Sequence, residues 1–200
     1  MRKTRLFSYV VEHDTGHAPN PYFGVCTLCR CKYKKLRGKH PNVVELAKPG
    51  DWIVGTGGAN TKKSAGHGKL VYAMKVEEKI TRGEYFRSLS FACKKPSGNK
   101  NECRSNGDNI SPMNQIERNE QYVLISRNHF YYFGENAIRI PRDQFPKLEK
   151  KGPGFRSKFD DDYIKRFENW ITRHKPGKRG DPCKQQTSEE RKPKRCESSC

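Results

Sequence analysis

The stretch KLVYAMKV, residues 69–76, constrains the fold most, because its side chains alternate with a period of two. Successive side chains of an extended chain point to opposite faces, so this alternation predicts a β-strand. One face would carry Leu70, Tyr72, Met74 and Val76, and the other Val71, Ala73 and Lys75. We therefore predict a strand over residues 70–76, the clearest in the chain.

A turn and a second strand precede that stretch. In AKPGDWIVGTGG, Pro49 presets one turn residue and Gly50 supplies the positive φ of the next. A strand is expected to leave this turn at residues 51–54. Short apolar runs predict further strands at residues 6–12, 121–134 and 137–141.

Two segments predict helices. Residues 158–175 carry apolar side chains at helical spacing, with acidic residues at the start and basic residues at the end, as the helix dipole favours. We expect the aromatic side chains of this stripe in the core and not at a stacking site. Residues 81–89 predict a shorter helix, and Thr81 and Glu84 match a capping box. The stripe consists of Tyr163, Ile164, Phe167, Trp170 and Ile171.

The composition changes at residue 175. Residues 175–200 contain no aliphatic or aromatic side chain, so they cannot bury enough apolar surface to offset the entropy of ordering their backbone. We predict a flexible, disordered basic tail over residues 175–200. A length of 200 residues allows one domain with appendages, and the predicted elements make residues 1–174 a single small β-rich domain of the α+β class.

The net charge of +19 indicates a polyanionic partner. The tail holds eight Lys and Arg against four Asp and Glu, so most of the charge belongs to the folded part. Nucleic acid is the expected partner, and a merely solvated basic surface is the alternative. We expect no membrane association, because the sequence has no run of about 18 apolar residues.

Cysteine usage and the N-terminal sequence bear on the compartment. The eight Cys are unevenly spaced, and nothing in the sequence indicates export. The apolar stretch near the N-terminus is short and ends in charged residues, unlike a signal peptide. We therefore expect reduced thiols and a cytoplasmic location.

The stretch YVVEHDTGHAPNPYFGVCTLCRCKYKK, residues 9–35, gathers the groups that bear chemistry. A metal site there would need three thiols and a fourth ligand. The candidates are Cys26, Cys29 and Cys31, with His13, His17, Cys93 or Cys103 as the fourth. Structural zinc is usually held by two well-spaced ligand pairs, and free Cys is among the most buried residue types. We therefore expect buried thiols, no metal and no cofactor.

Residues 5–145 contain, in this order, EHDTGHAPNPYFGVCTLCRCK, KPGDWIVGTGG, KLVYAMKVEEKITRGEYF, GDNI and YVLISRNHFYYFG. Together these motifs resemble the nucleotide-modification-associated domain family, type two. The resemblance implies association with systems that make or handle modified bases in the DNA of bacteria and their viruses. It does not by itself imply a reaction.

A second resemblance concerns the fold. The pair KPGDWIVGTGG and KLVYAMKV is similar to the turn and strands of PUA-like barrels, the group of the EVE, ASCH and YTH domains. It implies a PUA/EVE-like barrel with flanking helices. It also implies that a flipped base lies in a cleft beside the barrel, stacked on aromatic side chains.

Two functions of residues 13–31 are left open. In the catalytic interpretation, Cys26 is a nucleophile with His13 or His17 as its base, or Asp14 and Asp108 are acid and base. The protein would then install or trim a base modification. No P-loop, zinc-deaminase or serine-hydrolase signature is present in the sequence.

The favoured interpretation is a rigid platform for a base. Pro19 and Pro21 stiffen the loop around Asn20, so that little entropy is lost on binding. The residues predicted to bind the base are Asp14, Asn20, Tyr22, Phe23, Trp52, Asp108 and Asn109. Those predicted to bind phosphate are Lys32, Lys34, Lys35 and Arg37. The expected partners are nucleic acid, DNA above RNA, and enzymes of a base modification pathway.

Overall fold

The computed structural model describes residues 2–29, 42–94 and 121–184. The elements up to residue 94 are β1 (Leu6–Val11), β2 (Cys26–Leu28), α1 (Val43–Leu46), β3 (Trp52–Gly57), β4 (Lys69–Lys75), β5 (Glu78–Thr81), α2 (Arg82–Arg87) and the 3-10 helix η2 (Leu89–Lys94). Those from residue 121 are β6 (Tyr122–Ser126), β7 (Phe130–Tyr132), η3 (Gly134–Asn136), β8 (Ile138–Arg139), β9 (Phe155–Arg156), α4 (Asp161–Ile171) and β10 (Gly177–Lys178).

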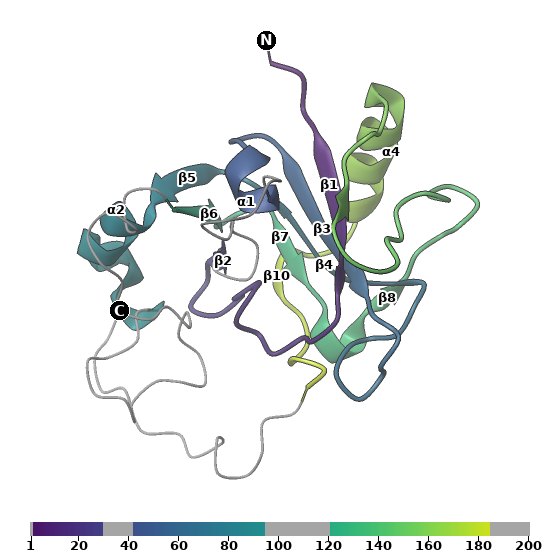
Figure 1. The fold of residues 1–200 in the computed structure, drawn as a ribbon, viewed down its shortest axis with the longest axis horizontal. Helices are drawn as coiled ribbons and strands as arrows, with labels where there is room; N and C mark the ends of the chain where they lie inside the picture. Colours follow the sequence, from purple (N-terminus) through teal and green to yellow (C-terminus); the bar gives the residue numbers. More distant parts are fainter. Residues whose placement is uncertain (1, 30–41, 95–120, 185–200) are drawn as a thin grey trace.

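The strands form two sheets (Figure 1). The larger sheet has the order β10-β7-β4-β3-β1-β9, with β8 also paired to β4, and the smaller sheet has the order β2-β6-β5. β1 runs parallel to β3, and β10 runs parallel to β7. Among the described strands neither sheet closes on itself. Two sheets with few helices confirm the α+β class. The PUA/EVE-like barrel is not confirmed.

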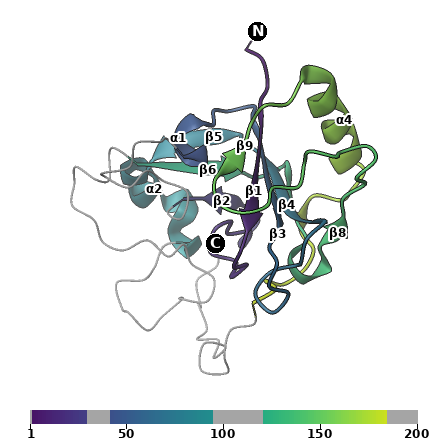
Figure 2. The ribbon, with the colours of Figure 1, turned by 45° about the vertical axis from the view of Figure 1, so that its right-hand side comes forward.

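The elements pack as layers around the larger sheet (Figures 1 and 2). One face of this sheet packs against α4, in a cluster that includes Trp52 and Phe167. The other face packs against the smaller sheet and α1, in a cluster that includes Tyr72 and Leu124. A third cluster, which includes Tyr85 and Phe91, joins the smaller sheet to α2 and η2. The larger sheet is thus covered on both faces.

β4 confirms the strand predicted from the alternation, with one correction. Across β3, the partner that follows Leu70 is Tyr72, so Val71 between them is the extra residue of a bulge. A bulge changes the face to which the following side chains point. Leu70 consequently packs on the α4 side and Tyr72 on the opposite side, although the sequence predicts both on one face.

Turn and helix signals in the sequence are confirmed. Gly50 has a φ of 91°, and the N–H of Asp51 donates to the carbonyl of Lys48. Thr81 and Glu84 form the capping box of α2. The stripe of α4 is buried as predicted, with Trp170 at its edge. None of the helices in the described ranges is long and apolar enough to span a bilayer.

The chain beyond residue 174 stays packed on the domain as far as residue 184, which corrects the predicted start of the tail. We call residues 175–184 the C-terminal strap. Its strand β10 pairs with β7, and the N–H of Glu135 donates to the carbonyl of Asp181 at 2.8 Å. Backbone hydrogen bonds need no apolar side chain, so composition alone gave the wrong boundary. Residues 185–200 of the predicted tail lie outside the described residues.

Candidate functional site

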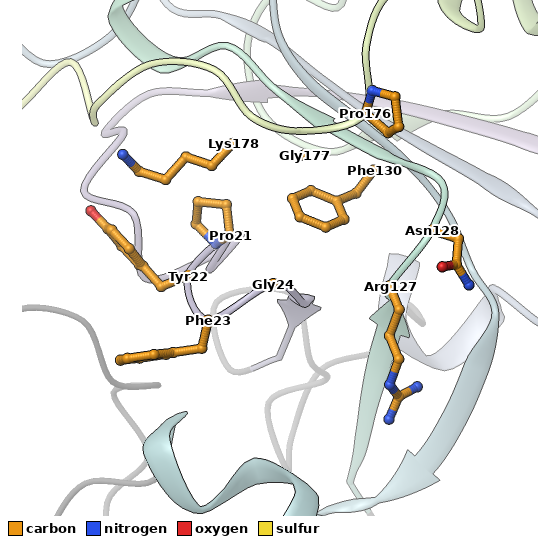
Figure 3. A pocket seen from close by; sticks show the side chains of 10 residues that line it. All are labelled: Pro21, Tyr22, Phe23, Gly24, Arg127, Asn128, Phe130, Pro176, Gly177 and Lys178. Atoms are coloured by element: carbon orange, nitrogen blue, oxygen red, sulfur yellow. The ribbon is translucent and has the colours of Figure 1, made fainter. Parts of the chain in front are cut away.

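A cleft of about 400 Å³ opens where three separate segments of the chain meet (Figure 3). This volume lies at the lower end of the roughly 300–1,000 Å³ that small-molecule sites occupy. The segments are the aromatic loop (residues 20–25), the β6–β7 turn (residues 127–129) and the C-terminal strap. The lining residues are Pro21, Tyr22, Phe23, Gly24, Arg127, Asn128, Phe130, Pro176, Gly177 and Lys178.

Aromatic rings supply much of the cleft wall. Phe130 is buried at the inner side, whereas Phe23 is 48% exposed at the rim. Phe23 has a φ of 59°, which is rare for a bulky side chain, and Gly24 follows with a φ of 70°. A backbone strained in this way costs about 1–3 kcal/mol and persists only where the surroundings fix it. The loop therefore holds a phenyl ring at the cleft edge despite strain and exposure.

A buried lysine ammonium fixes the aromatic loop from inside. Lys94, at the end of η2, is 1% exposed. Its Nζ donates to the carbonyls of Tyr22 and Val25 at 3.0 and 2.9 Å. It also donates to the carbonyl of Asn20 at 3.1 Å and to the side-chain oxygen of Asn20 at 2.7 Å. One cation thus holds four oxygens of the loop in place.

Asn20 is predicted to read the edge of a nucleobase. In the structure it lies at the start of this loop. Its side chain is fully buried, and its Oδ1 accepts from Lys94 and from the N–H of Tyr22. Its backbone pairs with Thr27 in both directions, at 2.9 Å each. The structure therefore brings Asn20 next to Tyr22 and Phe23 but uses its side-chain oxygen within the loop. Its base-reading role stays a prediction.

A carboxylate fixes the β6–β7 turn on the opposite wall. Glu77 accepts the backbone N–H groups of Arg127, Asn128 and His129 at 3.0, 2.8 and 3.0 Å. Burial alone would raise the pKa of Glu77, but these hydrogen bonds and one from the His129 ring hold it below the ordinary value. The carboxylate of Glu77 thus fixes one wall of the cleft by accepting from backbone N–H groups. The ammonium of Lys94 fixes the other wall by donating to backbone carbonyls.

Asp14, also predicted to bind a base, instead holds the C-terminal strap. Its carboxylate accepts the hydroxyl of Tyr132 at 2.6 Å and the N–H of Cys183 at 3.1 Å. Its carbonyl accepts the N–H of Lys184 at 2.9 Å. Burial raises the pKa of Tyr132 most, and the negative charge of Asp14 raises it further, well above its ordinary value. The phenol therefore stays protonated and donates. Asp14 is 1% exposed and does not line the cleft, although the strap that it holds does.

Trp52 lies on the other side of the larger sheet, away from Tyr22 and Phe23. Its ring stacks on Tyr131 at 6.3 Å and meets Phe167 edge-on at 5.6 Å, and it is fully buried. The structure does not bring Trp52 to the cleft. The remaining predicted residues, Asp108, Asn109, Lys32, Lys34, Lys35 and Arg37, lie outside the described residues.

Of the cysteines that the sequence offers as ligands or nucleophile, Cys26 and Cys29 are buried, whereas Cys93 is partly exposed. Cys26 is fully buried, with its sulfur 3.9 Å from that of Met74, and Cys29 is 1% exposed. Within the described ranges, no three His, Cys, Asp or Glu side chains gather as a metal site would require. Cys31 and Cys103 lie outside those ranges, so the absence of metal stays a prediction. Cys93 is disulfide-bonded, so the expectation of reduced thiols is wrong for this residue.

Comparisons with known proteins give one family. A family model described as nucleotide modification associated domain 2 matches residues 3–121 and 113–190, which covers the aromatic loop, the β6–β7 turn and the C-terminal strap. No curated protein and no solved structure matches the chain.

Proposed function

The chain belongs to the nucleotide modification associated domain 2 family, and on that premise we propose that the cleft binds a base of a nucleic acid. The family description links the chain to a nucleotide modification system. The base that enters is a modified base or one flipped out of its stack. DNA is the polymer, and enzymes of the modification pathway are the protein partners.

The placement of the Phe23 ring is the observation on which the proposal rests. Its ring is held half-exposed at the mouth of the cleft by a backbone in the left-handed region. The exposed face of the ring is unfavourable in water, and a base stacked on it would cover that apolar surface. A base stacked on an aromatic side chain gains about 1–3 kcal/mol, whatever the base.

The charge of the chain supports the same ligand. A net charge of +19 attracts a polyanion and raises its rate of encounter. At the cleft itself, Lys178 and Arg127 are among the lining residues, so cations flank an aromatic surface. Aromatic stacking with neighbouring cations is how proteins hold an unstacked base.

Fluorescence anisotropy with short single-stranded DNA, with and without a modified base, tests the proposal. We expect Phe23→Ala to weaken binding about fivefold to a hundredfold, the loss of one stacked ring. The matched control is Leu89→Ala. Leu89 is the other large apolar side chain that the described residues expose, at 87%, and it does not line the cleft.

Equal affinities of the two variants and the parent would reject the cleft as the base site. An absence of DNA binding at low salt would reject the nucleic-acid ligand as well, because phosphate contacts are strongest there. Conversion of the oligonucleotide into a new product, seen by mass spectrometry, would establish the enzyme interpretation instead.

A further inference from the structure

Two cationic side chains stand at opposite ends of the cleft (Figure 3). Lys178 of β10 lies at the end formed by Tyr22, with its Nζ 5.3 Å from the centre of that ring. Arg127 lies at the other end, beyond Phe130 and Gly24, and its guanidinium carbon is 5.5 Å from the ring centre of Phe91. The apolar part of the cleft separates the two charges. Cations at two separate ends of the cleft favour a ligand that carries a phosphate at each end.

Each cation is oriented, but neither is withdrawn from solvent. The side chains of Lys178 and Arg127 are 29% and 36% exposed. Their carboxylate partners, Asp181 and Glu78, are 70% and 48% exposed. Ion pairs this exposed contribute little to stability, because water and salt screen them. A phosphate can thus approach either cation without breaking a buried interaction.

We propose that the cleft binds an internal nucleotide of a DNA strand, with one phosphate on its 5′ side and another on its 3′ side. The inference rests on the proposed function and narrows its ligand, since a free base carries no phosphate and a nucleoside monophosphate carries only one for the two cations. In a strand, the two phosphates of a nucleotide leave its sugar in different directions. Cations at two ends of an aromatic surface match that arrangement, and they position the strand without reading its sequence.

The test compares four ligands that share one base: thymidine, its 5′-monophosphate, its 3′-monophosphate and its 3′,5′-bisphosphate. Their affinities are measured at one ionic strength by competition with a labelled oligonucleotide. We expect each phosphate to tighten binding about tenfold, as hydrogen bonds to charged groups do. The bisphosphate should therefore bind more tightly than either monophosphate.

Two substitutions test which cation contacts which phosphate. Lys178→Met should abolish the gain from one phosphate and keep the gain from the other, and Arg127→Met should do the reverse. Lys178→Arg keeps the charge and should keep both gains. Lys62→Met is the control, because it removes one positive charge from an exposed position that does not line the cleft.

The outcomes separate this inference from the proposed function. If the oligonucleotide and thymidine bind but phosphates add nothing, the internal-nucleotide ligand is rejected and base binding stands. The same follows if Lys62→Met lowers the phosphate gains as much as the two cleft variants do. If neither the oligonucleotide nor any of the four ligands binds, the proposed function falls too.

Discussion

The ammonium of Lys94 lies 2.7 Å from the side-chain oxygen of Asn20, and this contact joins η2 to the loop that carries Tyr22 and Phe23. Three carbonyl oxygens of the same loop surround that ammonium. Oxygens that converge in this way would repel one another without a cation between them. Lys94 is therefore a positioning residue for the cleft, although its own side chain does not line it.

Lys94→Met should destabilise the protein and weaken ligand binding together. The substitution keeps the length of the side chain but leaves buried oxygens without their donor, at an expected cost of about 2–4 kcal/mol in the free energy of unfolding. Urea unfolding measures this cost. Hydrogen exchange should become faster at the amides of residues 22–25 before it changes in β3 and β4.

Lys150→Met is the matched control for that substitution. Lys150 also donates to three carbonyls, those of Lys151, Gly152 and Pro153, but in a solvent-exposed loop. Water can replace its ammonium there, so we expect a loss below about 1 kcal/mol. Similar losses in both variants would show that burial of Lys94 has no special effect on the loop.

Glu77→Gln should loosen the β6–β7 turn and change the dependence of stability on pH. At neutral pH we expect a loss of about 1–3 kcal/mol, because an amide oxygen accepts the three backbone N–H groups more weakly than a carboxylate does. The neighbouring Glu78→Gln is the control, since Glu78 pairs with Arg127 at an exposed position.

The sign of the pH effect follows from the lowered pKa of Glu77. A carboxyl whose pKa is lower in the folded state stabilises the fold above its unfolded pKa, about 4.5, and loses this contribution as the pH falls through the folded value. The gap in unfolding free energy between parent and Glu77→Gln should thus be widest near neutral pH and shrink below about pH 4.5. A gap that stays constant down to pH 3 would contradict the role given to the carboxylate.

Local signals in the sequence were sufficient for several elements but not for the site. The turn at Gly50, the capping box at Thr81 and the stripe of α4 depend on neighbouring residues, and all three were predicted. The cleft depends on contacts between segments far apart, such as Lys94 with Asn20, which no local pattern encodes. One signal was overlooked: the polar residues 127–129 interrupt the apolar run at 121–134, and they form the turn that carries two lining residues.

Cys183 should react slowly with alkylating reagents in the native protein, and Asp14→Asn should speed the reaction. Burial, and then the neighbouring carboxylate of Asp14, raise the pKa of the Cys183 thiol to about 12, so little thiolate exists at pH 8. Removing the negative charge lowers this pKa, and we expect labelling to become about tenfold faster or more. Iodoacetamide labelling followed by peptide mass spectrometry gives the rate at Cys183 alone. Asp162→Asn, at an exposed position on α4, is the control and should leave the rate unchanged.

Truncation after His174 should destabilise the domain, whereas truncation after Lys184 keeps every described contact of the C-terminal strap. The shorter chain loses β10, the bond from the N–H of Arg179 to the carbonyl of Tyr132, and both bonds to Asp14. With each hydrogen bond worth about 0.5–1.5 kcal/mol, offset in part by the entropy regained, we expect a loss of about 1–3 kcal/mol in the free energy of unfolding. The shorter chain also lacks Lys178, so its affinity for thymidine 3′,5′-bisphosphate should fall even at temperatures where both chains are folded. Equal melting temperatures of the two truncated proteins would mean that the strap does not stabilise the domain in solution, and the cleft would then lose one of its three walls.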